Sequence, residues 1–195
     1  MEEKRVATFP KPVFHRIPNF IGAEKAANTL RKLLEYETAR SIFCNPDSPQ
    51  QPIREMALTD GKKVVMATPR LTKSFLLLDP NNIPFNHIYE ASMIHGAFKY
   101  GLSVRPDEIK IDLFVAGSVA VAPNGGRLGK ETGYSDQEYI IVKNAGSLAP
   151  QTPVVTTVHD IQIVENIPSD KWDIPVNIII TPTQLIRVTK AHSNV

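Results

Sequence analysis

Apolar residues follow two spacings along the chain, and each spacing predicts a different kind of element. Between residues 22 and 40 they lie three or four positions apart, opposite a lysine- and arginine-rich face, which predicts an amphipathic helix. Further helices are predicted over 53–59, 89–100 and 134–143. Short apolar runs bounded by glycine, proline and asparagine predict strands. These strands cover 41–44, 62–68, 75–78, 111–116 with its continuation 119–122, 154–158, 177–181 and 184–188.

The order of these elements predicts the fold class. Strands alternate with helices, and several strands are apolar at successive positions rather than at every second one. Such strands are covered on both faces, as in parallel sheets flanked by helices. Residues 1–21 carry Pro10, Pro12 and Pro18, which predicts an extended arm. Because the sequence has no internal repeat and no clear linker, we predict one α/β domain over residues 1–195, with 1–21 as its proline-rich arm.

Composition and charge narrow the class of protein. Hydrophobic residues make up 42% and charged residues 22% of the 195 residues, which is typical of a soluble globular chain. The formal net charge of +2 is too small for a surface that coats nucleic acid, so nucleic acid is not an expected partner. The single cysteine, Cys44, excludes a disulfide framework and a multi-cysteine metal site. The charged N-terminus and the short apolar runs predict no secretion signal and no membrane span, and hence a cytoplasmic location.

A glycine-rich segment between a predicted strand and a predicted helix is the strongest sign of chemistry. Its four glycines are Gly125, Gly126, Gly129 and Gly133. Successive backbone N–H groups in such a loop can cradle an anion, and the start of a helix adds partial positive charge. Arg127 and Lys130 place full charges in the same segment, which predicts a phosphate-binding loop. The alternative interpretation is a plain strand-to-helix connection with surface cations, since the spacing matches neither a Walker A loop nor G-x-G-x-x-G.

Residues 127–136 read R-L-G-K-E-T-G-Y-S-D and resemble the R-L-G-x-G-x-G-Y-Y-D loop of the 5-formyltetrahydrofolate cyclo-ligase family, the methenyltetrahydrofolate synthetases. The segments 111–115 and 167–181 are similar to that family's I-D-L-x-x-V strand and to its ending. The branch of methenyltetrahydrofolate synthetase domain-containing proteins is more similar still. Its motifs match residues 16–22, 69–71, 117–121, 127–139, 154–160 and 181–183.

This resemblance implies both a fold and a reaction. The implied fold is a three-layer α/β/α, Rossmann-like sheet of the CoA-transferase and ribose-phosphate-isomerase type. The implied activity is that of a carbon–nitrogen ligase of one-carbon metabolism, which converts 5-formyltetrahydrofolate to 5,10-methenyltetrahydrofolate and releases ADP and phosphate. The implied cofactors are ATP and Mg²⁺, and the implied partners are a small-molecule folate and a nucleotide.

The resemblance also implies roles for individual residues. The ATP loop of the family falls on Arg127, Leu128, Gly129, Lys130, Glu131, Thr132, Gly133, Tyr134 and Ser135. Its folate contacts fall on Lys130, Gly133 and Tyr134, and Lys130 and Arg127 are the implied catalytic residues. The magnesium ligand falls on Asp136, with Asp173 as a second carboxylate near the metal. Two carboxylates suffice for a dication that is held mainly by phosphate oxygens.

Departures from the family pattern support an alternative function. Only residues 1–6 come before the proline-containing part of the arm, where the family has a basic helix that grips ATP. The candidate replacements for its cations are Arg16, Lys25 and Arg70. The family's G-Y-Y-D-R is G-Y-S-D-Q at 133–137, and its pterin-holding Glu-Pro pair is not visible at 105–108. The alternative is a non-catalytic protein of the same fold that binds a nucleotide or folate, or has a regulatory role.

Two further side chains are weaker candidates for a ligand site. His159 follows the predicted strand 154–158, at the sheet edge where α/β proteins bind ligands, but a hydrogen-bonded structural role is favoured. Trp172 stands beside Asp173 and suits stacking on a ring ligand, with packing as the favoured interpretation.

Overall fold

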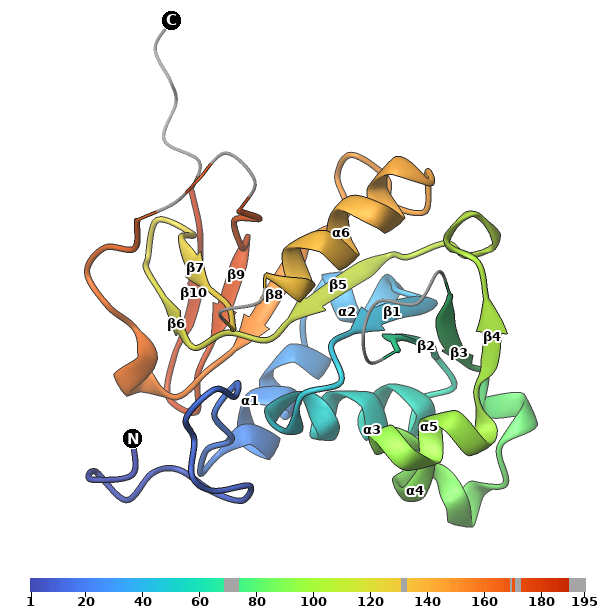
Figure 1. Ribbon diagram of the computed structural model, residues 1–195, viewed down its shortest axis with the longest axis horizontal. Helices are drawn as coiled ribbons and strands as arrows, with labels where there is room; N and C mark the ends of the chain where they lie inside the picture. The colour runs from blue at the N-terminus through green and yellow to red at the C-terminus, as the bar shows by residue number, and fades with distance from the viewer. Residues whose placement is uncertain (69–73, 131–132, 169, 171–172, 190–195) are drawn as a thin grey trace, which may run out of the picture.

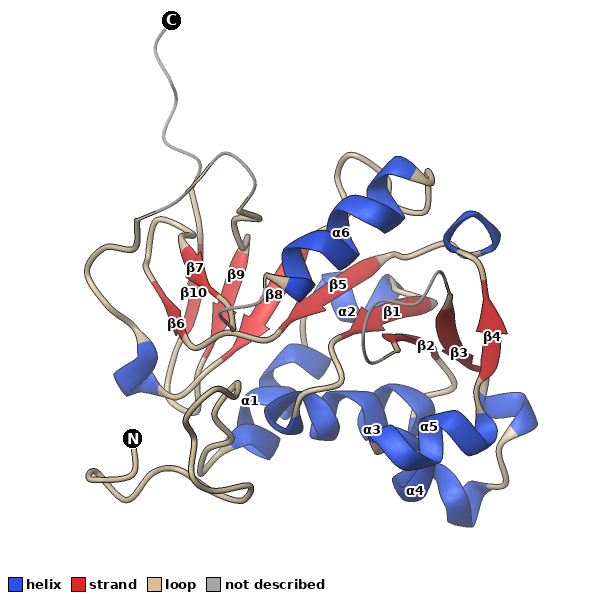
Figure 2. Cartoon of the chain, in the orientation of Figure 1, coloured by secondary structure: helices blue, strands red, loops and turns tan. Residues whose placement is uncertain are grey.

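A computed structural model describes residues 1–68, 74–130, 133–168, 170 and 173–189. Its centre is an eight-stranded mixed sheet in the order β10-β9-β8-β5-β1-β2-β3-β4 (Figure 1). The strands are β1 (Ser41–Cys44), β2 (Lys63–Ala67), β3 (Phe75–Leu78), β4 (Leu102–Val104), β5 (Leu113–Ala116), β8 (Val154–Thr157), β9 (Ile178–Ile180) and β10 (Leu185–Arg187). The helices are α1 (Ala23–Arg31), α2 (Leu34–Thr38), α3 (Gln51–Thr59), α4 (Ile88–Ser92), α5 (Ile94–Tyr100) and α6 (Tyr134–Asn144) (Figure 2).

The middle of the sheet is parallel and its margins are antiparallel. Strand β1 pairs in parallel with β2 and β5, and the parallel arrangement continues through β8 to β9. Phe43 is the register partner of both Val65 on β2 and Phe114 on β5. Strands β3, β4 and β10 add antiparallel edges. The carboxyl ends of β1 and β5 therefore lie side by side, where open α/β sheets bind their ligands.

Successive residues of the central strands point to opposite faces, and both faces are covered. Ile42 and Cys44 pack into the core beneath α1, α3, α4 and α5, whereas Phe43 lies in the core on the α6 side. On that side Phe43 stacks on Phe114 with ring centroids 4.5 Å apart, and Tyr139 of α6 meets Phe114 edge-on. Helices on both faces (Figure 1) make this a three-layer α/β fold, as predicted from strands that are apolar at successive positions.

Several predicted elements differ in the structure. The helix predicted over 22–40 is two helices, α1 and α2, because Leu33 between them takes an extended conformation with φ −86° and ψ 143°. The helix predicted over 89–100 is likewise divided into α4 and α5 by the extended Met93. Residues 119–122 do not continue β5 but contribute β6 (Ala120–Val121), which pairs with β7 (Arg127–Leu128) in a separate hairpin. Strand β4 was not predicted, because this edge strand is exposed and lacks an apolar run.

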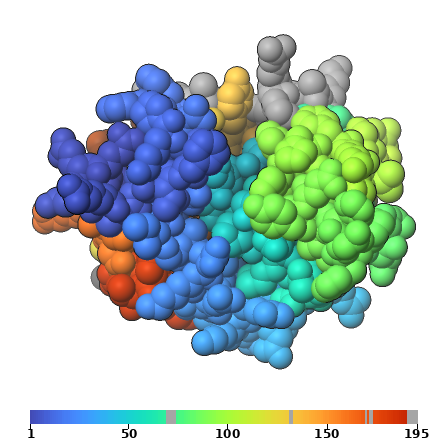
Figure 3. Space-filling view, turned by 90° about the horizontal axis from the view of Figure 1, so that it is seen from below, coloured from blue at the N-terminus to red at the C-terminus, as the bar shows by residue number. Residues whose placement is uncertain are grey.

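The proline-rich arm folds back on itself and packs against the segments that follow β8 and β9. Ala7 and Phe20 form an isolated antiparallel bridge, and the Phe20 ring meets His159 edge-on at 6.1 Å. Gly22 has φ +93°, and a Cβ atom there would lie 2.7 Å from Pro182 Cγ, so only glycine fits. Seen from below, the arm and the α4–α5 region lie on opposite sides of the segment that leads from β1 into α3 (Figure 3). Among the described helices, none is both long and apolar enough to cross a bilayer.

Candidate functional site

Two adjoining pockets open where β1 and β5 end. The first, which we call the acidic pocket, has a volume of about 270 Å³. Its lining includes Ile17, Asn45, Pro46, Asp47, Ile94, Tyr134, Ser135 and Glu138. The second, the arm pocket, has a volume of about 620 Å³. Its lining includes Val13, Phe14, His15, Arg16, Arg127, Leu128, Ile161, Val164, Pro168 and Asp173. Gly129, Lys130, Gly133 and Asp136 line both pockets, so the predicted loop forms the wall between them.

The first half of the glycine-rich segment is a structural turn and not an anion cradle. The Gly125 N–H donates to the Ala122 carbonyl at 2.9 Å, and the Gly126 N–H donates to Asn124 Oδ1 at 2.9 Å. Gly125 has φ +93°, and a Cβ atom there would lie 2.7 Å from the Val176 carbonyl oxygen. These amides close the hairpin between β6 and β7, so the predicted use of all four glycines for an anion is wrong for this pair.

The side chain of Arg127 is buried and ion-paired. Its exposed fraction is 1%, and its Nη2 forms an ion pair and a short hydrogen bond with Asp136, whose side chain is 15% exposed. Arg127 Nη1 donates to the Gly117 carbonyl at 3.0 Å, and the Ile174 N–H donates to the same Asp136 oxygen at 3.1 Å. Arg127 therefore joins β7 to the first turn of α6 and to the end of β5. Leu128, the next residue, has an exposed side chain at the arm pocket.

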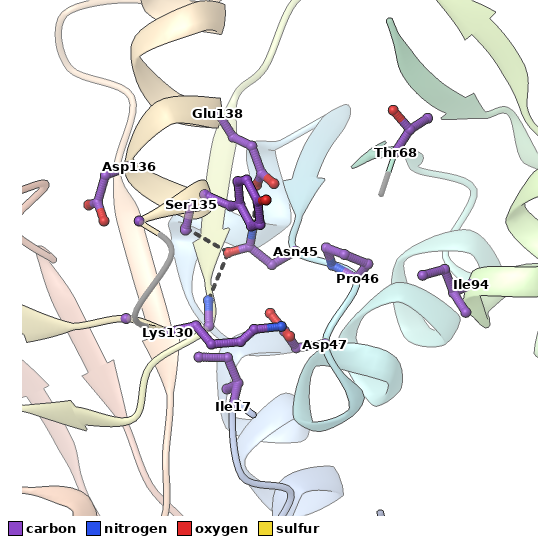
Figure 4. A pocket seen from close by; sticks show the side chains of 14 residues that line it. Ile17, Asn45, Pro46, Asp47, Thr68, Ile94, Lys130, Ser135, Asp136 and Glu138 are labelled. Carbon is purple, nitrogen blue, oxygen red and sulfur yellow. Dashed lines mark hydrogen bonds between the residues drawn. The ribbon is translucent and has the colours of Figure 1, made fainter. Parts of the chain in front are cut away.

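The second half of the segment leads to the N-terminus of α6. Gly133 is the N-cap residue and provides no side-chain cap, and Tyr134, Ser135 and Asp136 form the first turn. The N–H groups of that turn have no acceptor within the helix and carry its positive dipole end. Lys130 extends across the acidic pocket toward Asp47 (Figure 4). Of the predicted ATP-loop residues, Glu131 and Thr132 lie outside the described part of the chain.

Asn45 organises the floor of the acidic pocket. Its Oδ1 accepts hydrogen bonds from the Gly117 N–H and from Ser135 Oγ, each at 2.9 Å (Figure 4). Its Nδ2 donates to Glu138 Oε2 at 2.6 Å. Asn45 and Glu138 are 2% and 5% exposed, so these polar groups are almost entirely removed from bulk water. One asparagine thus connects the ends of β1 and β5 to the first two turns of α6.

The two carboxyl groups of this floor are shifted toward their neutral forms. Burial, with the nearby Asp47 carboxylate as the second cause, raises the pKa of Glu138 to about 8. The hydrogen bond from Asn45 and the charge of Arg127 oppose that shift. Burial also raises the pKa of Asp47, against the opposing charge of Lys130. The acidic pocket therefore offers carboxyl oxygen atoms that can bind N–H donors.

A buried arginine holds the loop that carries Asn45 and Asp47. Arg54 is 2% exposed and donates to the carbonyls of Asn45 at 2.6 Å, Asp47 at 3.0 Å and Ser92 at 2.7 Å. Burial lowers the pKa of Arg54, since the charged form is desolvated. The guanidinium joins the end of α4 to the loop after β1, and so fixes one wall of the acidic pocket.

The residues predicted to bind magnesium suit a hydrated ion and not a metal cage built by the protein. Asp136 and Asp173 line the same arm pocket. One oxygen of Asp136 is engaged by Arg127, and Asp173 Oδ2 accepts the Asp170 N–H at 2.7 Å. Across the described residues, no three His, Cys, Asp or Glu side chains gather to hold a metal ion. Such a pair fits Mg²⁺ that takes most of its ligands from phosphate and water.

The other candidates from the sequence lie in different places. Arg16 is exposed and lines the arm pocket, whereas Lys25 lies on α1 beside a separate groove. Residues 105–108 form a surface turn, with Glu108 accepting the Arg105 N–H, and line neither pocket. His159 Nδ1 accepts the Ile161 N–H, in keeping with the favoured structural role. Arg70 and Trp172 lie outside the described residues.

Sequence reasoning did not identify Asn45, Asp47 and Glu138 as site residues. Asn45 and Asp47 directly follow the apolar run 41–44, and polar residues at the carboxyl end of a parallel strand are a recognisable signal. Glu138 occurs five residues into a helix, where a glutamate is usually solvated. Its burial is set by the packing of α6 on β5, which the helical pattern does not contain.

Comparison with known proteins identifies relatives along almost the whole chain. The model of the 5-formyltetrahydrofolate cyclo-ligase family matches residues 1–182. A methenyltetrahydrofolate synthase domain-containing protein of Bos taurus is 39% identical over 192 residues, which cover 95% of this chain and 50% of that protein. Its human counterpart is 35% identical, with the same coverage of 95% and 50%. The chain therefore spans about half the length of these curated relatives.

Solved structures support the same fold. The NMR structure of Aquifex aeolicus 5,10-methenyltetrahydrofolate synthetase superposes with a TM-score of 0.59 at 21% identity, covering 88% of this chain and 83% of that one. A 5,10-methenyltetrahydrofolate synthetase from Mycoplasma pneumoniae gives a TM-score of 0.54 at 16% identity, covering 82% and 84%. The family model, which matches most of the sequence, shows that the chain belongs to the 5-formyltetrahydrofolate cyclo-ligase family.

Proposed function

We propose that the protein catalyses the ATP- and Mg²⁺-dependent cyclisation of 5-formyltetrahydrofolate to 5,10-methenyltetrahydrofolate, or a closely related reaction. The observation that carries this proposal is the pair of pockets separated by one loop, with Lys130 lining both. A ligase that joins phosphoryl transfer to ring closure needs two substrates whose reacting atoms meet, and a shared wall with a cation suits that need.

We assign one substrate to each pocket from the charges of the lining residues. The arm pocket has Arg16 as an exposed cation of its own, shares Lys130 with the acidic pocket, and has Asp136 and Asp173 as carboxylates for a hydrated magnesium ion, so it suits the nucleotide. The apolar lining of the arm pocket, which includes Phe14 and Leu128, suits the flat base of the nucleotide. The acidic pocket offers hydrogen-bond acceptors and suits the nitrogen-rich ring of a folate.

The roles of the site residues follow from this arrangement. When bound, the magnesium nucleotide supplies the phosphoryl group that turns the formyl oxygen into a leaving group. Lys130 would neutralise the charge that develops between the two pockets, and the N–H groups in the first turn of α6 would add to that effect. Asp136 and Asp173 would hold the hydrated ion. Arg127 would act by holding Asp136 and Gly117 in place, since its guanidinium is already engaged by both.

The direct test is the growth of methenyl-folate absorbance with 5-formyltetrahydrofolate and ATP, with and without Mg²⁺. Lys130→Ala should lower the rate by at least a hundredfold without changing the unfolding midpoint, because removal of one electrostatic stabiliser of a transition state costs roughly that factor. Lys25→Ala is the matched control, since Lys25 lies on α1 outside both pockets, and should keep the wild-type rate. Absence of any ATP-dependent product from the wild-type protein would refute the proposal.

One observation favours a second candidate function, which is binding without turnover. The predicted catalytic Arg127 and the predicted magnesium ligand Asp136 are paired with each other in the structure. A protein that holds a folate or a nucleotide for regulation would need no free arginine at this place. Calorimetric titration with ATP and with 5-formyltetrahydrofolate separates the candidates, because binding of either ligand without product formation supports the second.

A further inference from the structure

The floor of the acidic pocket carries a hydrogen-bonding group whose orientation is determined by its neighbours. Asn45 Oδ1 accepts from the Gly117 backbone N–H, which can only donate. The amide of Asn45 therefore turns its Nδ2 toward Glu138, whose Oε2 accepts at 2.6 Å. Arg54 donates a hydrogen bond to the backbone carbonyl of Asn45, so the Asn45 Nδ2 donor belongs to a fixed wall of the pocket.

Glu138 then has one carboxyl oxygen left for a ligand. Its Oε1 receives no hydrogen bond from any described residue, and Glu138 lines the acidic pocket. In Figure 4, Glu138 and Ser135 descend from α6 toward Asn45, with Lys130 and Asp47 across the pocket. Glu138 is 5% exposed, and its Oε1 is not one of the fully enclosed, unpaired atoms among the described residues, so this oxygen is reached from the pocket. An amino donor in the occupant would replace the water lost there and would favour the ionised, accepting form of the carboxyl group, against the burial that raises its pKa.

The remaining walls limit the shape and the charge of that occupant. Ile17, Pro46 and Ile94 provide apolar surfaces, and Tyr134 at the pocket is 43% exposed. A volume of about 270 Å³ admits a flat bicyclic ring but little more. Asp47 adds a second carboxyl group, which disfavours phosphate. The occupant that fits is a planar nitrogen heterocycle whose amino group points to Glu138.

We propose that Glu138 is the specificity-determining residue of the acidic pocket and that it binds the exocyclic amino group of an amino-substituted pteridine ring. Naming a pteridine rests on the function proposed above, whereas the need for an amino donor rests on the pocket alone. Among the described residues, Glu138 is the only glutamate that lines either pocket.

Glu138→Gln tests this assignment with little change in shape. A glutamine side chain would still accept from Asn45 Nδ2, which is held in place by Gly117, and would then turn its own NH₂ group to the pocket. The NH₂ group of the glutamine would then face the amino group of the ring, and because both are donors, the ring would lose its hydrogen-bond acceptor. We expect pterin to bind roughly tenfold to a hundredfold more weakly, the range for one hydrogen bond to a charged or buried group.

The two probes are pterin and 4-hydroxypteridine, which lacks the 2-amino group of pterin. Each is titrated by calorimetry into the wild-type protein, into Glu138→Gln and into the control variant Glu165→Gln. Glu165 is an exposed loop residue. The proposal expects the wild type and the control to prefer pterin by at least tenfold, and Glu138→Gln to lose that preference. Equal affinity of the wild type for the two rings, or binding of neither, would overturn it, even if Glu138→Gln failed to fold. An equal loss for both rings would assign Glu138 a merely structural role and also overturn it. Methenyl-folate formation is measured separately, so failure of the proposed reaction is distinguishable from failure of this inference.

Discussion

Replacing the buried acid Glu138 by glutamine should change how the stability of the protein depends on pH. The carboxyl group has a pKa of about 8 in the folded protein, against an ordinary value of 4.5. Between these values the folded state holds a proton that the unfolded state has released. Folding stability contributed by this group therefore falls as pH rises, by about 1.4 kcal/mol per pH unit. Glutamine does not titrate and removes this dependence.

The magnitude can be worked for a convenient pH range. From pH 5.5 to pH 7.5 the wild-type protein should lose about 3 kcal/mol of unfolding free energy through Glu138, relative to the variant. Urea unfolding of both proteins at pH 5.5, 6.5 and 7.5 measures the difference, with Glu165→Gln as an exposed control that should follow the wild type. A difference that stays constant to within roughly 0.5 kcal/mol, the usual scatter of such comparisons, would refute the reasoning. Such a result would mean that the Asn45 hydrogen bond and the neighbouring cations keep Glu138 ionised.

Three further predictions concern other parts of the structure. Arg127→Met should lower the unfolding free energy by about 3 kcal/mol, because Asp136 would be left partly buried without its partner, and adding Asp136→Asn should restore part of the loss in urea unfolding. Gly22→Ala should destabilise the folded protein more than Gly146→Ala does. Both glycines have positive φ, but of the two only Gly22 would bring its new Cβ against another chain segment. Thermal unfolding of the two variants measures the difference. Cys44 should not react with a thiol reagent at pH 8 until the protein unfolds, because burial raises the thiol pKa to about 11, and release of the coloured thiolate monitors this.

Elements with a strong local pattern were predictable from the sequence. The four-residue strands β1 and β3 have the predicted bounds, and α6 begins at the predicted Tyr134. Each has either an unbroken apolar run or a helical repeat, and a glycine or proline marks its limits. The helix divided at Leu33 shows the limit of this reasoning. Its apolar spacing continues past the break, but the bend at Leu33 leaves Leu34 66% exposed and buries Tyr36 instead.

The candidate site was predictable only in part. The resemblance of residues 127–136 singled out Lys130 and the start of α6, and in the structure both line the acidic pocket and the arm pocket. The pairing of Arg127 with Asp136 was not predictable, because two oppositely charged residues nine positions apart have no fixed relation until a hairpin and a helix orient them. The glycines of the hairpin turn gave the same sequence signal as a phosphate cradle, since both structures need positive φ and close backbone approach.

The amino-acid sequence by itself determined the α/β class, the order of the main elements and the membership in one family, because these depend on local apolar patterns and on short motifs. Only the tertiary structure decided which polar side chains are buried together. Asn45 and Glu138 are separated by 93 residues and meet because parallel pairing places the ends of β1 and β5 beneath α6. Burial then removes water from their hydrogen bond and shifts the charge of the carboxyl group. That effect has no counterpart in the linear chain, since desolvation depends on what surrounds a residue in space.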